Sequence, residues 1–534
     1  MSLSIKPSVK GGLTPRTRTI LFLGGCVLIT SAAVWLVSST LVITRETRLA
    51  SFLWVAGFGF LFFNVAYQFV LSLCHLLIGK PPVLKESYVH DFPKVALVYP
   101  VRNEMHGLLE RARYSFSGNK LPNVDLWILS DSAEGFERYE REVVEELLKE
   151  HPGRVFYRRR KEPVERKQGN IAEFLHAHPE YSLLYICDAD GMVPKGALLK
   201  LLKKALHPEN RDIAIFQAFV KIAHAATWYA RLEKIGADLS QRFSFTAFQA
   251  VFGRTISFGH HHLARAALLR KIRLPRGLLS HDNWDTVLLD QMGYRVAFCT
   301  DVYAFDEAPS NYLEARARSR RWSQGTLQGS PLVWKPGISL ASRFLAFYGI
   351  YVYWADLVFF LWVILGVLAH SEPVGELIHF EIDSIWFGFC TNSALKGVLF
   401  FSLLVVVFHK VTILKTSRDF KAFIYEAVFS MLITLNNFVY APLDMITIPI
   451  RKLQWNPMKK DPFTKINFGS VARELWLGTA FGFYGFYFCS FKTPYFVWQA
   501  APILASLSLS ILTVYLTSKT IPEGWEKWTS FKER

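Results

Sequence analysis

The chain has 534 residues, of which 51% are hydrophobic and 15% aromatic, and its formal net charge is +17. This composition is too apolar for an average soluble protein of that length, so it indicates a chain that combines a membrane part with a soluble part. Basic loops beside membrane segments explain most of the positive charge and an anionic ligand is the second explanation, whereas nucleic acid is disfavoured because no helix-turn-helix, zinc finger or RNA-binding aromatic signature is present.

The cysteines form no CxxC pair and stand mostly in apolar surroundings. They are Cys26, Cys74, Cys187, Cys299, Cys390 and Cys489. We interpret them as small buried hydrophobes and not as a disulfide or zinc framework.

Two apolar segments near the N-terminus, 20–43 and 52–78, are each long enough to cross a bilayer, which takes about 20 mostly apolar residues. The arm before them carries Lys6, Lys10, Arg16 and Arg18. Positive residues stay cytoplasmic, so 1–79 is predicted as a cytoplasmic arm with two transmembrane helices. A cleaved signal peptide is the alternative, which the length of the first segment and the second segment directly after it disfavour.

The segment 80–343 is predicted as a cytoplasmic domain in which short apolar strands alternate with helices. The expected strands are KVALVYPV, VDLWILSDS, GRVFYRRR, SLLYICDAD and DIAIFQAF, and the expected helices include 137–149 and 194–206. Such alternation predicts a mostly parallel sheet with helices on both faces, which binds ligands at the carboxyl ends of its strands. Asp131 and the pair Asp188 and Asp190 fall at such ends.

A basic helix start precedes the strand that leads to Asp188. In Arg166-Lys167-Gln-Gly-Asn170, Lys167 is suited to meet a diphosphate as a point charge, and Gly169 permits close backbone approach. An ordinary helix N-terminus is the alternative. The upstream basic run 158–161 is interpreted as a solvated or lipid-facing patch.

Asp188 and Asp190 follow the apolar strand LLYIC. Alternation along the strand predicts that both carboxylates point to the same side. Two hard oxygen ligands suit Mg²⁺ or Mn²⁺ that also binds phosphate oxygens. Because Asp-X-Asp is common in turns, an ordinary turn is the alternative.

Three adjacent histidines follow Gly259, at 260–262. On extended backbone they cannot all face one ion, because alternate residues point oppositely. We therefore expect polar contacts to sugar hydroxyls more than a zinc site, with one histidine in a structural role.

Asp282, in SHDNWD, precedes an amphipathic helix. Helix capping is the ordinary role there, since Asp is favoured at helix starts. The functional alternative is a general base that deprotonates a hydroxyl, with His281 as the next candidate. Asp285 and Asp290 are predicted as helix surface residues.

Arg321 and Trp322 lie in the basic helical segment RARSRRWSQG. A helix of this kind near a membrane can simply hold anionic lipid. The functional alternative is a pyrophosphate clamp by Arg321, with Trp322 as a platform for a sugar ring.

The region 344–517 is predicted as transmembrane helices, with spans at 344–368, 394–414, 475–491 and 495–516. The apolar run 423–450 has basic residues on both sides, so we predict a re-entrant or interfacial hairpin there, broken near Pro442. The count is six spans plus this element, and 518–534 is a cytoplasmic tail.

The order Asp131, Asp188 and Asp190, Asp282, then Arg321-Trp322 resembles the family 2 membrane glycosyltransferases, which include cellulose, chitin and hyaluronan synthases. The segments RKQGNIAEF, GHHHLAR, LLSHDNWDTVLLDQMGYRVAF and RRWSQGTLQ, with APLDM and WNP, are similar to those of bacterial glucans biosynthesis glucosyltransferase H. Two departures from the wider family are Ser130 before Asp131 and Arg318 where its QxxRW motif has glutamine.

This resemblance implies an α/β GT-A (Rossmann-like) cytoplasmic domain inserted in an α-helical transmembrane bundle of the bacterial inner membrane. By resemblance, Asp131 contacts uridine, Lys167 and Arg321 the diphosphate, Asp188 and Asp190 the nucleotide and Mg²⁺ (or Mn²⁺), Asp282 is the base and Trp322 floors the acceptor site. The implied partners are UDP-glucose, a β-glucan acceptor, membrane lipid, and by family resemblance acyl carrier protein and periplasmic glucan-processing proteins.

The sequence therefore predicts an inverting hexosyltransferase that moves glucose from UDP-glucose onto a growing β-glucan, with export as a further step. A non-processive transferase that glycosylates a lipid carrier is one alternative. A transporter or channel with a regulatory nucleotide-binding domain is the other, since Asp356 and Lys410 lie in predicted spans and intramembrane charges are functional candidates.

Overall fold

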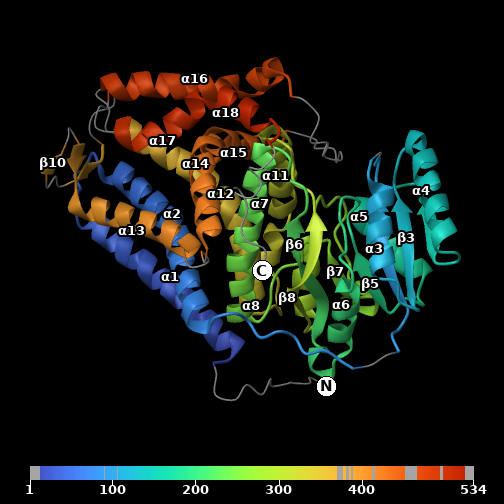
Figure 1. The fold of residues 1–534 in the computed structure, drawn as a ribbon. Helices are drawn as coiled ribbons and strands as arrows, with labels where there is room; N and C mark the ends of the chain where they lie inside the picture. Colours follow the sequence, from blue (N-terminus) through green and yellow to red (C-terminus); the bar gives the residue numbers. More distant parts are fainter. Residues whose placement is uncertain are drawn as a thin grey trace.

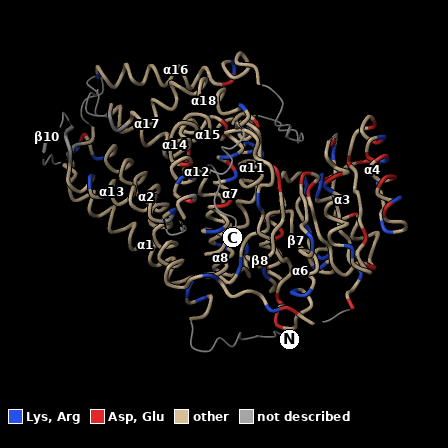
Figure 2. Tube along the Cα trace, in the orientation of Figure 1, with Lys and Arg blue, Asp and Glu red and all other residues tan. Residues whose placement is uncertain are grey.

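The computed structural model describes residues 13–88, 91–104, 106–369, 377–380, 384–386, 389–411, 414, 416–450, 466–492 and 497–522. An α/β domain lies on one side of the described chain and a group of long apolar helices on the other (Figure 1). Charged residues gather on the α/β domain, densely along α4 (Glu137–Glu150), and few lie along α1 (Pro15–Ser38) and α2 (Arg48–Ile78) (Figure 2).

A seven-stranded sheet forms the centre of the α/β domain. Its strands are β2 (Val95–Val101), β3 (Val124–Ser130), β4 (Val155–Arg159), β5 (Leu183–Ile186), β6 (Ile213–Ile222), β7 (His262–Arg265) and β8 (Arg295–Asp306). They lie in the order β4-β3-β2-β5-β7-β6-β8, with β7 antiparallel to both of its neighbours and the other pairs parallel. The predicted mostly parallel sheet is confirmed, and β7 and β8 are additions to it.

Alternating side chains of strand β2 enter two separate cores. Val95, Leu97 and Tyr99 pack on one face against α3 (Leu108–Gly118), α4 and α6 (Ala197–Leu206). Ala96 and Val98 pack on the other face with side chains of α5 (Arg166–Ala177). Both faces of the strand are buried, which explains its nearly continuous apolar sequence.

Four helices of the α/β domain lie between the sheet and the apolar helices. They are α7 (Trp228–Ser240), α8 (Thr246–Phe252), α10 (Asp282–Gln291) and α11 (Tyr312–Leu327), and the short α9 (Ala266–Leu269) follows β7. Phe248 and Phe252 of α8 share an aromatic core with Phe22 of α1 and Phe344 of α12 (Leu340–Ala369). The domain is therefore packed directly against the helices at both ends of its sequence.

Several apolar helices lie at the predicted spans or in the segment predicted as a re-entrant or interfacial hairpin. Beside α1, α2 and α12 they are α13 (Ser393–Val411), α14 (Ser417–Ile433), α15 (Asn437–Ile446), α16 (Phe468–Lys492), α17 (Val497–Ser508) and α18 (Ser510–Thr517). Among the described residues, four helices are long and apolar enough to cross a membrane: Pro15–Ser38, Arg48–Ile78, Leu340–Ala369 and Asp419–Ile446. A fifth is possible if α17 and α18, bent by 65°, form one span.

The helical segment after α13 differs in detail from the prediction. Pro442 lies inside α15, and the break falls earlier, where a 3₁₀ turn at Thr434–Asn436 joins α14 to α15. The break expected near Pro442 is therefore wrong, while the re-entrant or interfacial hairpin over 423–450 stays a prediction. The start of the tail pairs with the α/β domain, because Ile521 N donates to Ala226 O; residues 523–534 lie outside the described part.

Candidate active site

One large cavity joins the carboxyl ends of the strands to the helices beside the sheet. Its volume is about 1750 Å³. Every site residue predicted from the sequence lines it: Asp131, Lys167, Asp188, Asp190, Asp282, Arg321 and Trp322. The structure thus brings together side chains that are up to 191 positions apart in the sequence.

Asp131 is held in a buried ion pair. It follows β3, and Arg160 Nε and Nη2 donate to its two carboxylate oxygens at 2.7 Å each. Asn170 Nδ2 donates to Oδ1 at 3.0 Å, and the side chains of Asp131 and Arg160 are only 5% and 4% exposed. The interpretation of 158–161 as a solvated patch is wrong for Arg160, because a bidentate carboxylate partner compensates its burial.

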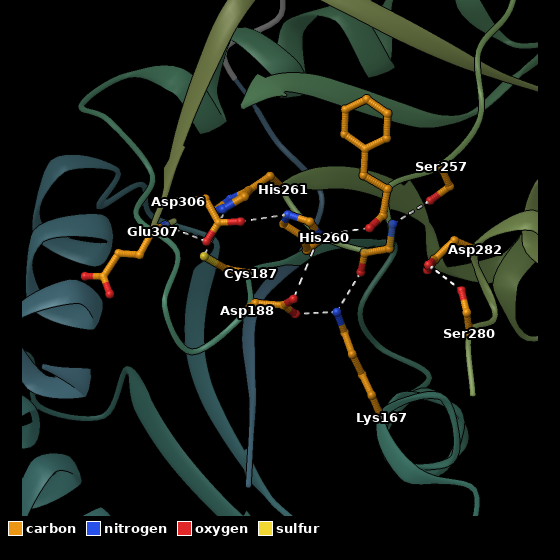
Figure 3. A network of polar contacts seen from close by, with 12 residues as sticks. Lys167, Cys187, Asp188, Ser257, His260, His261, Ser280, Asp282, Asp306 and Glu307 are labelled. Carbon is orange, nitrogen blue, oxygen red and sulfur yellow. Dashed lines mark hydrogen bonds and ion pairs between the residues drawn. The ribbon is translucent and has the colours of Figure 1, made fainter. Parts of the chain in front are cut away.

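Asp188 and Lys167 form the charged centre of the cavity (Figure 3). Lys167 Nζ contacts Asp188 Oδ1 and donates to the backbone oxygen of Gly259 at 2.8 Å. Burial favours the neutral form of Asp188, but Lys167 and His260 outweigh it and lower the pKa of Asp188 to about 2. Asp188 is therefore ionised at neutral pH and available as a hard oxygen ligand.

The backbone around Asp188 is a turn. Strand β5 ends at Ile186, and Gly191 N donates to Asp188 O at 2.8 Å. The strand alternation that we expected to align Asp188 with Asp190 therefore does not extend to these residues. Both still line the cavity, because the turn lies at the strand's carboxyl end.

His260 links two carboxylates that lie at the carboxyl ends of different strands. Its Nε2 lies 3.2 Å from Asp306 Oδ2, and its Nδ1 lies 3.8 Å from Asp188 Oδ2. Burial opposes protonation, but Asp188 and Asp306 raise the pKa of His260 to about 9. His260 is thus charged at neutral pH and balances part of the acidic charge on the cavity floor.

His261 overturns the expected alternation of the three histidines. Its φ of +51° is left-handed, so its ring lies beside that of His260, with centroids 4.9 Å apart. Burial and the nearby charge of His260 lower the pKa of His261 to about 3. His260, His261 and Asp306 offer ligand atoms that all lie within 4.8 Å of one another, which extended backbone would not permit.

Asp282 lies against the backbone of Gly259. A Cβ on Gly259 would lie 2.8 Å from Asp282 Cγ and closer still to Oδ1, and the φ of Gly259 is +75°. Asp282 is the first residue of α10 and follows the N-cap His281; its Oδ2 accepts from Ser280 Oγ at 2.8 Å. Its side chain is 30% exposed towards the cavity. Asp282 is therefore a carboxylate with access to a ligand, at a helix start that favours negative charge.

The two other acids of α10 are buried. His281 Nδ1 lies 2.6 Å from Asp285 Oδ2, and burial is outweighed by Asp285 and Asp282, which raise the pKa of His281. Asp290 pairs with Arg254 and accepts from the backbone N of Ser339 at 2.6 Å. The prediction of Asp285 and Asp290 as surface residues is wrong, since both are 8% exposed.

Helix α11 brings the basic and aromatic side chains to the cavity. Burial, with Arg318 nearby, lowers the pKa of Arg321, which stays charged because arginine's pKa is so high. The guanidinium of Arg318 lies 4.5 Å from the centroid of the Trp322 ring and pairs with Glu233 of α7. Trp322 is 54% exposed, so its ring is accessible to a ligand in the cavity.

The donor set suits a divalent cation. Asp188, Asp190 and Asp306 line one cavity and are oxygen donors of the kind that Mg²⁺ and Mn²⁺ prefer. The imidazoles of His260 and His261 lie beside Asp306, and His261 Nε2 is buried without a hydrogen-bond partner. The residues present therefore fit a site for such an ion.

Several site residues were not predicted as such from the sequence. Arg160, Asp306 and Glu233 all line or support the cavity. A signal existed for Asp306, because it follows the apolar run VYAF and precedes Glu307 and Pro309, much as Asp131 follows the apolar run of β3. Arg160 and Glu233 carry no such local signal, since tertiary contacts alone select their partners.

Comparisons with known proteins identify similar sequences and structures. Residues 139–381 match the model of the family described as Glycosyl transferase family 21. Proteins named "Glucans biosynthesis glucosyltransferase H" from Pseudomonas putida and Pseudomonas entomophila are 25% identical over 484 and 483 residues. These alignments cover 83% of this chain and 55% of each relative, so the chain spans about half the length of those proteins. The predicted resemblance to proteins named glucans biosynthesis glucosyltransferase H is confirmed.

Two solved glycosyltransferase structures are also similar. A mannosyltransferase from Pyrobaculum calidifontis, in complex with GDP-Man and Mn²⁺, is 15% identical, with a TM-score of 0.49 over 76% of this chain and 100% of that one. Glucosyl-3-phosphoglycerate synthase from Mycobacterium tuberculosis, in complex with Mn²⁺ and UDP-glucose, is also 15% identical, with a TM-score of 0.30 over 48% of this chain and 81% of that one.

Proposed function

We propose that this chain, a relative of bacterial glucans biosynthesis glucosyltransferases, is an inverting membrane glucosyltransferase that moves glucose from UDP-glucose onto a growing β-glucan. The observation that carries the proposal is the position of Gly259. Its backbone oxygen binds Lys167 of the Lys167–Asp188 pair, and its Cα lies against Asp282. A charged group suited to a diphosphate and a carboxylate suited to a hydroxyl are therefore separated by a single residue.

Direct displacement at the anomeric carbon requires one base and a stabilised leaving group. Asp282 is the proposed base: its carboxylate takes the proton of the acceptor hydroxyl as that oxygen bonds to the anomeric carbon. The glycosidic bond to UDP breaks, and the bonding electrons leave with the diphosphate. Lys167 and Arg321 are proposed to hold that growing negative charge, in a partly buried site where such charges interact strongly.

A bound Mg²⁺ or Mn²⁺ would neutralise diphosphate charge as a Lewis acid. Asp188 and Asp190 are proposed to hold it, with Asp306 lining the same cavity. Asp131 is proposed to contact the uridine. The Arg160 and Asn170 contacts already use both of its oxygens, so they fix the carboxylate in one orientation before a nucleotide enters.

We also propose that the α/β domain is cytoplasmic and that α14 and α15 lie at the membrane interface, and contacts along this segment support the interfacial position. Tyr425 Oη donates to the backbone of Trp228 in α7, at one end. Asp444 accepts from Arg316 and Arg320 of α11, at the other. These contacts are 19 residues apart, or about 28 Å of helix, which approaches the thickness of a bilayer core. If this segment crossed the membrane, its two ends would lie on opposite sides of the bilayer, although both of them contact the α/β domain.

The test is turnover by the purified full-length protein. We expect UDP release from UDP-glucose in the presence of Mg²⁺ or Mn²⁺, little release from other UDP-sugars, and none in excess chelator. Linkage-specific hydrolases should then degrade the product to glucose. Binding of UDP-glucose without turnover under any of these conditions would instead indicate a regulatory nucleotide-binding domain, the transporter or channel alternative.

A lipid-linked acceptor is the second candidate. The cavity continues past Trp322 to Gly349 and Val352 of α12 and Ser430 of α14, so an acceptor with an apolar tail has access from the membrane helices. A single product of one length that partitions into organic solvent favours this reading. A ladder of water-soluble chains favours the growing β-glucan.

A further inference from the structure

Helices α7 and α11 are joined by a chain of polar contacts that ends at Trp322. Tyr229 Oη donates to Glu233 Oε1 at 2.9 Å, and the other oxygen of Glu233 pairs with Arg318. The Arg318 guanidinium lies 4.5 Å from the centroid of the Trp322 ring, one helical turn further along α11. All four side chains line the cavity.

The chain of contacts covers one face of the indole. The ring is 54% exposed, so packing alone leaves it free to change rotamer. A guanidinium over an aromatic face is attracted by the ring quadrupole, and arginine's planar group stacks where a lysine ammonium cannot. With one face covered by Arg318, the opposite face is the one presented to a ligand.

Arg318 itself is held in place. Its side chain is 17% exposed and that of Glu233 is 25% exposed, so their ion pair is largely shielded from solvent. The Tyr229 ring also packs edge-on against Tyr312 at the start of α11, with centroids 6.3 Å apart. The two helices are therefore locked on either side of the Arg318–Glu233 pair.

We propose that Arg318 and Glu233 are positioning residues that fix the plane of Trp322 as the platform for the acceptor sugar. This inference rests on the proposed glucosyltransferase function. The pair does not contact the reacting atoms: it acts through Trp322, and it sets affinity for a ring with an apolar face, as a pyranose has. Donor binding at Lys167 and Asp188 does not depend on it.

The kinetic test uses purified full-length protein, UDP-glucose and cellotetraose as the acceptor probe. In Arg318→Gln, the acceptor KM should rise roughly 2- to 30-fold, the range that a cation–π contact spans, while the donor KM changes less than twofold. Arg318→Lys should be intermediate. Glu233→Gln should reproduce the defect, and the double variant should be no worse than the single ones. Arg138→Gln, which removes the exposed Arg138–Glu142 pair on α4, is the matched control.

A second readout needs no turnover. Acrylamide quenching of the Trp322 emission, taken as the difference from Trp322→Phe, should increase in Arg318→Gln and not in Arg138→Gln. An unchanged acceptor KM, or equal rises in both KM values with a lower Tm, would overturn the positioning role. Absence of UDP release by the unsubstituted protein would reject the proposed glucosyltransferase instead, and unchanged quenching would then reject the positioning of Trp322 independently.

Discussion

Gly259 and Asp282 lie against each other on the cavity floor, and any side chain at position 259 would have to displace the Asp282 carboxylate. The Cβ of any other side chain would overlap the Asp282 carboxylate. The same glycine accepts from Lys167 through its backbone oxygen. Asp282, the proposed base, and Lys167, the proposed diphosphate ligand, therefore both contact the backbone of Gly259. A shift of that backbone would change the distance between the two side chains.

Gly259→Ala should therefore reduce transfer far more than it reduces stability. A displacement of about 1 Å in a reacting group can cost about 100-fold in rate, so we expect at least that loss in kcat. The left-handed backbone adds strain of about 1–2 kcal/mol. Gly196→Ala is the matched control, since Gly196 has a φ of +78° and nothing within 4 Å of an added Cβ. If Gly259→Ala and Gly196→Ala lost equal activity, backbone strain alone would explain the loss at position 259.

The variant Asp282→Asn distinguishes a general base from a residue that only stabilises the start of α10. Asparagine keeps an oxygen for the Ser280 hydroxyl and lacks a titratable carboxylate, so the fold should survive. Transfer should fall about 10²–10⁴-fold, the usual contribution of a general base. UDP-glucose binding by calorimetry should stay near that of the unsubstituted protein. Near-normal transfer would move the base to another residue, with His281 the next candidate.

Removing Arg160 should destabilise the α/β domain. Arg160→Met leaves the buried Asp131 carboxylate with the Asn170 amide in place of its ion-pair partner, and breaking a buried ion pair costs about 3–5 kcal/mol. The free energy of unfolding should fall by that amount in urea titrations that follow the α/β domain. Arg138→Met, in the exposed Arg138–Glu142 pair, should change it by less than about 1 kcal/mol. A loss below 1 kcal/mol for Arg160→Met would mean that Asp131 is not desolvated.

The sequence predicted the part of the site that lies at the ends of apolar strands. Asp131 and Asp188 follow runs of buried residues, and a parallel sheet places such ends at one edge. The partners of these two residues could not be predicted in this way, because Arg160 and His260 come from separate segments that only the folded sheet places beside Asp131 and Asp188. The left-handed φ of His261 is a further example, since no local pattern in three consecutive histidines specifies which one leaves the extended conformation.

Strands β7 and β8 were not predicted from the sequence, and the reasons are physical. Strand β7 has four residues, is antiparallel to both neighbours and begins with a histidine, so neither length nor apolar content marks it. Strand β8 is interrupted by Thr300 and Asp301, at the register shift between Ala218 and Phe219 of its partner β6. The five strands that were predicted are each dominated by aliphatic or aromatic residues.

The proposed interfacial position of α14 and α15 predicts how cysteines introduced in this segment react with a labelling reagent. Ser417 and Ile450 stand at its two ends, and Ile450 is 82% exposed. Cysteines introduced at both positions should react with a membrane-impermeant maleimide only from the cytoplasmic side. Asp444→Asn, which weakens the contact with Arg316 and Arg320, should increase the labelling rate at position 450. Labelling from opposite sides would show that Asp419–Ile446 crosses the membrane.

The His281–Asp285 pair predicts a pH-dependent contribution to stability. The pKa of His281 is raised above its ordinary value of 6.5, so its charged form is favoured by folding. The stabilisation is complete below pH 6.5 and is lost as the pH rises through the raised pKa. His281→Gln should therefore lower Tm most at pH 6, and the difference from the unsubstituted protein should shrink as the pH rises. His176→Gln, at an exposed position, is the control for the substitution itself and should change Tm little. A His281→Gln deficit that grows with pH would mean that folding favours the neutral imidazole.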